Sequence, residues 1–215
     1  MERRKIVILT KSAMHKGFCV AGIDICSGNS GKWVRLVSDA NGSSLGKNYT
    51  AYRNTIGECQ PLDVVSVNII ANVPIHNQRE NCQISAESMY KLGTCENIHQ
   101  VLQFHQAENH QYIFGNASKR LTEYDMQGFN FNHSLILVYV QNLIFTTSDY
   151  GKNKANFIYN GIQYKYMSVT DPEYFAEKIA DGTKFDNAYL VVSMPKEPYN
   201  KDGCYYKFIA KVFPV

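Results

Sequence analysis

The pair Asn160-Gly161 constrains the fold of this chain more than any other short feature. Asparagine followed by glycine readily adopts the two positive φ angles of a type I′ turn. β-branched and aromatic residues flank the pair, at 156–160 and 162–169, so these segments are predicted to form a β-hairpin. A long run of the same residue types, 134–147, comes before the hairpin. It is too long for a flat strand, and we expect a bulge or bend within it.

Helix signals follow the hairpin. Thr170 and Asp171 can cap a helix, Pro172 suits its first turn, and the apolar spacing continues to Ala180. The sequence therefore predicts a short helix over 172–180, and then two more strands over 188–193 and 204–213. The order β-β-β-α-β-β over 134–215 is that of a five-stranded OB barrel. Small barrels of this kind bind nucleic acids, sugars or other proteins.

The first part of the chain is also rich in strands, which turn residues separate. Its predicted strands are Lys5–Leu9, Phe18–Asp24, Lys32–Val37 and Leu62–Ile70. Between the two parts, residues 96–105 place Ile98, Val101, Leu102 and His105 on one face of a predicted helix. The expected fold is mostly β with minor α. It consists of a first OB-like barrel over 1–85, a helical bridge over 86–131 and a second OB-like barrel over 132–215.

The distribution of charge says more than its total of +3. The three predicted regions carry net charges of +4, −2 and +1, so the basic excess lies on the first barrel. So small an excess of basic residues is equally consistent with an ordinary solvent-exposed surface. No segment is long and apolar enough to span a membrane, and the first residues do not resemble a signal peptide, so we expect a cytoplasmic protein. The six cysteines, without paired spacing, fit reduced thiols.

Signals of catalysis are weak. Gly31-Lys32 lacks the other residues of a phosphate-binding loop, and Cys95 with His99 gives only two potential zinc ligands. Cys19 and His15 have no third group to orient them. We therefore expect no enzyme activity, no metal and no cofactor.

Several polar and aromatic residues occupy positions that a hydrophobic core does not require. Trp33 and Arg35 share one side of a strand and could form a platform for stacking and phosphate contacts. Alternatively, Trp33 fills the core and Arg35 covers it. The polar run 76–81 could contact bases or a nucleotide, or it could satisfy the backbone of a connection. In the second barrel four rings are candidates for base stacking, but strand alternation could instead point them into the barrel: Phe157, Tyr159, Tyr164 and Tyr166.

The chain resembles the dual OB-containing domain family over nearly its whole length. The resemblance is carried by the order of several segments: 5–12, 18–22, 31–38, the strand from Leu62, 78–81, 157–164, 169–172, 190–193 and 206–210. It implies two OB folds, a bacterial or phage origin, and nucleic-acid or nucleotide binding, often near defence or counter-defence systems. Family members tend to carry proline after the arginine, whereas this chain has Leu36.

These observations favour a non-enzymatic protein that binds nucleic acid, single-stranded by preference. Lysine and arginine would contact phosphates, and aromatic rings would stack on bases. One alternative is a protein-interaction module, an activator or inhibitor of a defence system; another is a pocket for a nucleotide-like small molecule. The predicted binding residues are Lys11, Ser12, Trp33, Arg35, Ser38, His76, Gln78, Arg79, Glu80 and Asn81.

Overall fold

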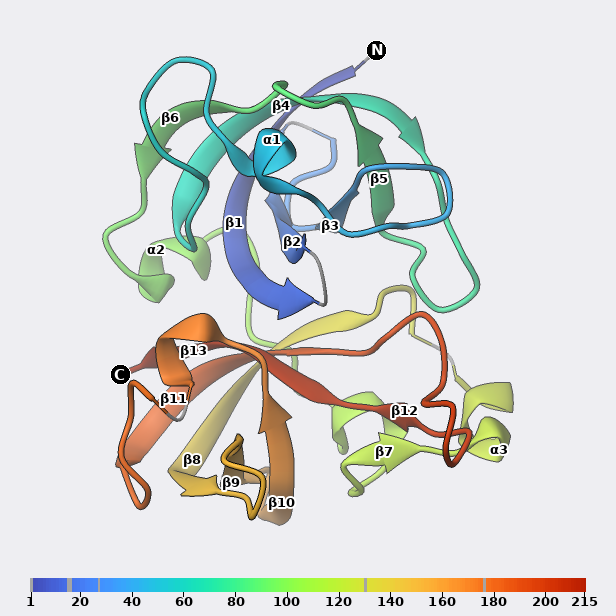
Figure 1. Ribbon diagram of the computed structural model, residues 1–215, viewed down its shortest axis with the longest axis vertical. Coiled ribbons are helices and arrows are strands. Elements are labelled where there is room, and N and C mark those ends of the chain that lie inside the picture. Colours follow the sequence, from blue (N-terminus) through green and yellow to red (C-terminus); the bar gives the residue numbers. More distant parts are fainter. Residues whose placement is uncertain (1, 15–16, 27, 130, 176) are drawn as a thin grey trace. The chain divides into compact units, whose positions relative to one another are not determined.

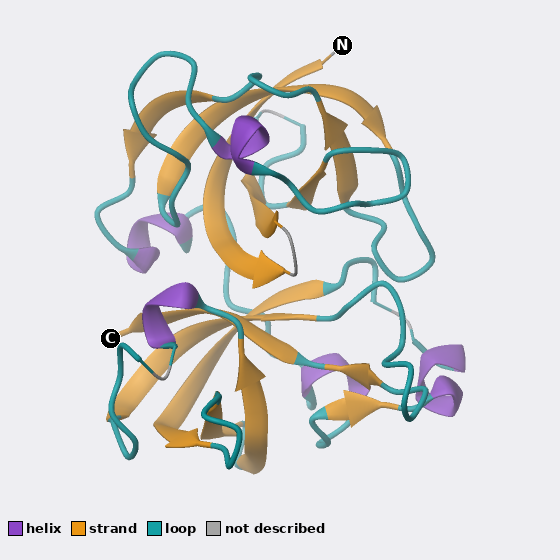
Figure 2. Ribbon diagram, viewed as in Figure 1, coloured by secondary structure: helices purple, strands orange, loops and turns teal. Residues whose placement is uncertain are grey.

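The computed structural model describes residues 2–14, 17–26, 28–129, 131–175 and 177–215. The chain divides into two compact units, residues 1–106 and 107–215, and each is built mainly from strands (Figure 2). The prediction of a mostly β fold is therefore confirmed.

The first unit is a six-stranded sheet whose pairings close into a ring (Figure 1). The strands pair in the order β1-β2-β3-β5-β4, and β4 pairs back to β1. All pairs are antiparallel except β3 with β5. The sixth strand, β6, adds to β4 outside this ring. The bounds are β1 Glu2–Met14, β2 Gly17–Asp24, β3 Trp33–Val37, α1 Lys47–Thr50, β4 Asp63–Asn72, β5 Asn81–Ile84, β6 Tyr90–Thr94 and α2 Ile98–Val101.

The second unit contains a closed barrel with the same connectivity. Its strands pair in the order β10-β13-β11-β8-β9, and only β10 and β13 are parallel. In both units the first strand pairs with the second and fourth, and the third lies parallel to the last, so each unit is an OB-like barrel. The bounds are η1 Ile113–Gly115, β7 Arg120–Leu121, α3 Glu123–Gln127, β8 Leu135–Thr147, β9 Asn153–Tyr159, β10 Ile162–Val169, η2 Pro172–Tyr174, β11 Lys184–Ser193, β12 Tyr205–Tyr206 and β13 Phe208–Pro214.

Local predictions in the second barrel have mixed outcomes. The hairpin turn is confirmed, because Asn160 and Gly161 have φ angles of 49° and 75°. The bulge in the first strand is confirmed as well: β8 changes register between Gln141 and Ile144, and Asn142 has a φ of 51°. The predicted helix over 172–180 is wrong: among the described residues of this range only η2 forms, and residue 176 lies outside them. The backbone becomes extended at Phe175.

Side-chain packing explains the missing helix. Tyr174 stacks on Phe145 with ring centroids 5.1 Å apart, and Ile179 packs against the same core. A helix of about nine residues is only marginally stable by itself, so these contacts decide the backbone path. The helix expected over 96–105 is similarly reduced to α2, although Ile98 and Val101 are buried as expected.

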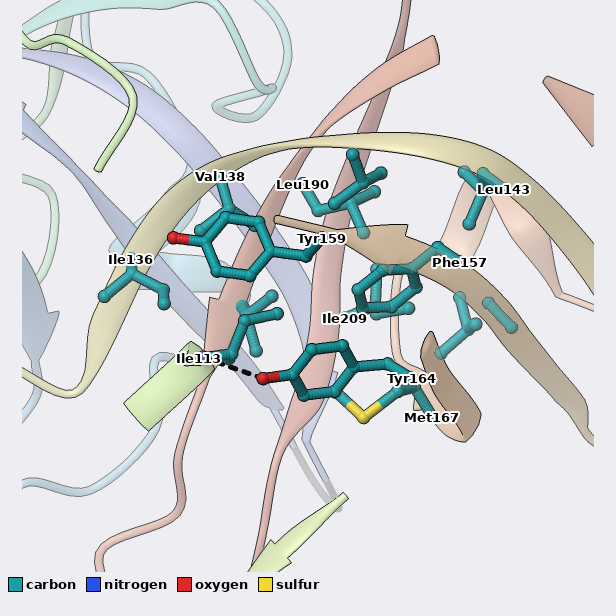
Figure 3. Close-up of a cluster of buried hydrophobic side chains, with 14 of the residues drawn as sticks. Ile113, Ile136, Val138, Leu143, Phe157, Tyr159, Tyr164, Met167, Leu190 and Ile209 are labelled. Atoms are coloured by element: carbon teal, nitrogen blue, oxygen red, sulfur yellow. Dashed lines mark hydrogen bonds between the residues drawn. The ribbon is translucent and has the colours of Figure 1, made fainter. Parts of the chain in front are cut away.

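The helical bridge over 86–131 is not confirmed. Part of this region is β6, which belongs to the first unit. Residues from 107 onward belong to the second unit, where the segment 108–116 packs on the barrel. Ile113 N–H donates to the hydroxyl of Tyr164 at 2.9 Å, the hydrogen bond drawn in Figure 3. Tyr159 donates to the backbone of His110 at 2.8 Å. The segment is therefore part of the second barrel's structure.

In the part of the chain that the structure describes, no helix is long and apolar enough to cross a membrane. All six cysteines are free thiols.

Candidate nucleic-acid interface

Arg35 lies on β3, between two core residues of the first barrel. Because Val34 and Leu36 point into the core, Arg35 points to the outer face of the strand, yet it is only 6% exposed. Its Nε donates to Glu80 Oε1 at 3.2 Å, and its backbone N–H donates to the Glu80 carbonyl at 3.0 Å. Its Nη1 contacts Cys19 Sγ. Arg35 is thus engaged within the protein and does not form an open platform.

Trp33 occupies the same side of β3 and is also 6% exposed. Its ring meets the ring of His105 edge-on, with centroids 5.3 Å apart. His105 is held in turn by a 2.8 Å hydrogen bond between its Nδ1 and the Gly31 carbonyl. In this structure the arrangement matches the packing alternative for Trp33 rather than the stacking alternative.

The three predicted residues Lys11, Ser12 and Ser38 also have partners within the first barrel or are buried. Lys11 Nζ lies 2.8 Å from Glu58 Oε2 and 4.6 Å from the centroid of the Phe18 ring. The hydrogen bond from Lys11 lowers the pKa of the Glu58 carboxyl. Ser12 is buried, and Ser38 Oγ donates to the carbonyl of Ser44 at 3.1 Å.

The polar run 76–81 forms the connection from β4 to β5 and the start of β5. Gln78, Glu80 and Asn81 are buried, and the Asn81 amide lies 3.5 Å from Gln78 Oε1. His76 and Arg79 are exposed. Cross-strand pairing sets Asn81 beside Arg35. The structure therefore brings Arg35, Glu80 and Asn81 together, but it leaves only His76 and Arg79 of this run open to solvent.

The corresponding strands of the second barrel present a more open surface. β9 alternates strictly, so that Ala155, Phe157 and Tyr159 are buried while Lys154, Asn156 and Ile158 are half-exposed on the outside. Three of the four predicted stacking rings therefore fill the barrel: Phe157, Tyr159 and Tyr164 (Figure 3).

Tyr166 behaves differently from the other three rings because of a bulge in β10. The register with β9 changes between Tyr164 and Met167, both of which are buried. The extra residue lets Tyr166 leave the barrel, where it is 59% exposed, with a φ of 54°. Asn156 Oδ1 accepts from the Tyr166 N–H at 2.9 Å and fixes this backbone. An exposed ring therefore lies on the outer face beside β9.

Three lysines place positive charge on this face: Lys154 pairs with Ser168, Lys152 comes just before β9, and the Lys119 carbonyl accepts from the N–H of Lys207 at 2.9 Å, next to Phe208, which also pairs with Ser168. Burial is the main cause that lowers the pKa of Lys154, and the positive charges of Lys119 and Lys152 lower it further. Lys154 Nζ donates to Ser168 Oγ at 2.7 Å. Among the described residues, no carboxylate forms an ion pair with any of these three lysines. A bound anion would relieve their mutual repulsion.

The strand register explains how this surface is assembled. Thr146, Lys154 and Ser168 lie side by side on β8, β9 and β10. The turn between β8 and β9 adds Lys152 and Tyr150, which is 90% exposed. In OB folds the second and third strands and the loop between the first two strands are the usual site for oligonucleotides. We call Lys119, Lys152, Lys154, Tyr166 and Ser168 the second-barrel face.

Sequence reasoning missed most of this face. Alternation along 153–159 puts Lys154 on the side opposite Phe157 and Tyr159, a signal that could have identified Lys154. Lys119 gave no such signal, because it lies outside the five barrel strands, just before β7. In the described ranges, no three His, Cys, Asp or Glu side chains converge as metal ligands.

Two barrels of OB connectivity, one with an outer face of lysines and an exposed ring, define a dual-barrel protein of the OB class. The model of the dual OB-containing domain family matches residues 4–212, and the chain belongs to that family. No curated protein and no solved structure matches the chain.

Proposed function

We propose that this protein is a non-enzymatic binder of single-stranded nucleic acid and that the second-barrel face is its principal binding surface. The observation that carries the proposal is the cluster of Lys119, Lys152 and Lys154, without ion-pair partners in the described chain, next to the exposed ring of Tyr166. Lysines that line the path of a strand neutralise its phosphates, and an aromatic ring stacks on any base without reading its sequence.

The choice of a single strand follows from the chemistry of the face. A ring that lies on the barrel surface needs an unpaired base to stack on, which a duplex does not offer. The polar groups beside the ring, Asn156 and Ser168, are few, so strong sequence preference is not expected. The proposed binding site therefore lies on the second barrel, whereas the sequence predicted it around Arg35.

The test is the salt dependence of binding to a fluorescent 12-nucleotide single strand, measured by anisotropy. Replacing Lys119, Lys152 and Lys154 together by glutamine should weaken binding. It should also reduce the slope of log K against log salt by about 2, at about 0.7 for each lost phosphate contact. The matched control replaces three exposed lysines elsewhere, Lys32, Lys47 and Lys178, by glutamine and should leave the slope nearly unchanged.

Two outcomes contradict the proposal. If the wild-type protein does not bind the oligonucleotide at low salt, the alternative of a protein-interaction module takes its place. If the triple variant and its control have equal slopes, the protein binds nucleic acid elsewhere than on the second-barrel face.

A further inference from the structure

A second cluster of cations surrounds one tyrosine of the first barrel. Tyr90 opens β6, the strand that lies outside the barrel ring. The guanidinium carbon of Arg3 lies 5.3 Å from the centroid of the Tyr90 ring, and that of Arg53 lies 6.0 Å from it. Two arginines thus converge on one ring from different parts of the chain, namely β1 and the loop after α1.

The register of the sheet places a third cation in the same group. Lys5 on β1 pairs with Ser66 on β4, and Ser66 pairs with Tyr90 on β6. This row belongs to the outside of the barrel, because the neighbouring residues Ile6 and Val65 are core residues. Lys5 is exposed, as are both arginines.

Both arginines are held in place while their terminal nitrogens stay available. Arg3 Nε donates to Ser66 Oγ at 2.7 Å, which leaves its two Nη groups for another acceptor. The backbone N–H of Arg53 donates to the Met89 carbonyl at 2.9 Å. Asn54 pins the same loop to β6 through two hydrogen bonds with the Lys91 backbone, of 2.8 and 2.9 Å. The loop that carries Arg53 is therefore fastened beside Tyr90.

The charge of this group is not balanced by neighbouring acids. Lys91, the next residue on β6, is paired with Asp63 at 2.6 Å, and Arg4 on β1 is paired with Glu2 at 2.8 Å. In contrast, no ion pair is found for Arg3, Lys5 or Arg53 within the described residues. Two guanidinium groups with available Nη atoms and one ammonium group suit a phosphate, whose oxygens accept several charged hydrogen bonds at once.

We infer that Arg3 and Arg53, which lie over the Tyr90 ring, form a phosphate-binding site of the first barrel together with Lys5 on the same outer face of the sheet. The site is formed by β1, β6 and the loop after α1, and not by the second and third strands that OB folds usually employ. Its ligand is a phosphoryl group, supplied either by a nucleic-acid strand or by a free nucleotide. The site is built from the first barrel alone and does not depend on the second-barrel face.

The experiment uses the full chain and follows the Nε–H resonance of Arg3 by NMR. The hydrogen bond to Ser66 slows exchange of this proton with water and makes the resonance observable; Arg3→Gln assigns it. Inorganic pyrophosphate, ATP and a 12-nucleotide single strand are added separately. We expect the resonance to shift with pyrophosphate. A shift with the oligonucleotide identifies a strand as the source of the phosphate, and a shift with ATP but not with the oligonucleotide identifies a free nucleotide.

The matched variants are Arg3→Gln/Arg53→Gln and, as a control with equal loss of charge, Lys47→Gln/Lys178→Gln. If a strand is the ligand, the first pair should reduce the salt slope by about 1.4, for two phosphate contacts at about 0.7 each, and the control should not. Circular dichroism checks that both stay folded.

The inference fails if none of the three probes moves the Arg3 resonance. The Lys119/Lys152/Lys154 triple variant distinguishes failure of this inference from failure of the proposed function. If the resonance still shifts there while oligonucleotide affinity is unchanged, the first-barrel site stands and the second-barrel face is wrong. If affinity falls only in the triple variant and the resonance never shifts, the reverse is true.

Discussion

Arg35 and Glu80 are 45 residues apart in the sequence, yet they form an ion pair of 3.2 Å with side chains 7% and 2% exposed. The parallel pairing of β3 with β5 creates this proximity, because it sets Arg35 beside Asn81. The pair therefore fastens the third strand of the first barrel to the connection between β4 and β5. A buried charge that loses its partner is costly, so the pair bears on folding more directly than on ligand contact.

Substitution of Arg35 should therefore destabilise the protein. We expect Arg35→Ala to lower the free energy of unfolding by about 3–5 kcal/mol, since it leaves the Glu80 carboxylate buried without its partner. Urea titration followed by circular dichroism measures this. The control is Arg79→Ala on the same connection, which is exposed and should change stability by no more than about 0.5 kcal/mol. Equal stability of the two variants would contradict the structural role of the pair.

Trp33 gives a second test of the first barrel. Because its ring is buried and packs on His105, we expect Trp33→Ala to cost about 3–5 kcal/mol of folding free energy. Trp33→Phe should cost less, because a ring remains against His105. Chemical denaturation of the two variants measures both values. A stable Trp33→Ala protein that has lost oligonucleotide binding would restore Trp33 as a stacking residue.

The boundary of the second barrel can be tested with fragments. The segment 108–116 supplies the hydrogen-bond partners of Tyr159 and Tyr164 and three acceptors for Lys207 Nζ, at 2.5, 2.8 and 2.8 Å. We therefore expect residues 107–215 to unfold cooperatively and residues 132–215 to lack a cooperative transition, because the shorter fragment leaves these buried groups without partners. Thermal denaturation of both fragments decides the point; a cooperative transition in the shorter one would show that the segment is dispensable.

Lys207 should make stability depend on pH. Burial lowers the pKa of Lys207 to about 7, although the charge of Asp125 acts in the opposite direction. In the unfolded chain this lysine keeps its ordinary pKa, so between about pH 7 and 10 the unfolded state binds more protons than the folded state. Lys207 therefore contributes a free energy of unfolding that rises with pH in this range and levels off below pH 7.

The measurement compares wild type with Lys207→Met between pH 7 and 8.5; the thiols and tyrosines contribute equally to both proteins, so the difference between them isolates Lys207. The free energy of unfolding of wild type minus that of the variant should rise with pH. Parallel pH profiles would mean that Lys207 stays fully charged in the folded protein, held by its three oxygen acceptors.

Sequence patterns identified the barrels because their signals are local. The turn at Asn160-Gly161 and the apolar alternation of β9 need no distant partner to be recognised. The strands β5 and β6 escaped prediction because they have only four and five residues, and β6 contains Gly93. Their place is decided by pairing with β4, which the sequence does not encode locally.

The candidate sites were harder to predict because they depend on distant contacts and on one irregularity. The sequence alone does not connect Arg35 with Glu80; only the β3–β5 pairing brings them together and buries them. Simple alternation puts Tyr164 and Tyr166 on the same side of β10. The bulge reverses this for Tyr166, and a tyrosine at positive φ carries no sequence signal, unlike glycine or asparagine.

Tyr166 has an exposed ring and a left-handed backbone, so a substitution there can test binding without a loss of stability. Tyrosine is disfavoured at a φ of 54°, and its ring is mostly exposed, so Tyr166→Gly removes backbone strain and little packing. We expect the variant to be as stable as wild type, or more stable by up to about 1 kcal/mol. If the ring stacks on a base, the free energy of binding to a single strand should weaken by about 1–3 kcal/mol.

Two control variants separate the ring from other effects. Tyr166→Phe should keep most of the affinity because the ring remains. Tyr124→Ala removes a ring that is 82% exposed elsewhere and should not affect binding. Denaturation and anisotropy are measured on the same samples. A Tyr166→Gly variant with unchanged affinity would show that the ring takes no part in binding, whereas one that has lost several kcal/mol of stability would show that Tyr166 is a structural residue of the barrel.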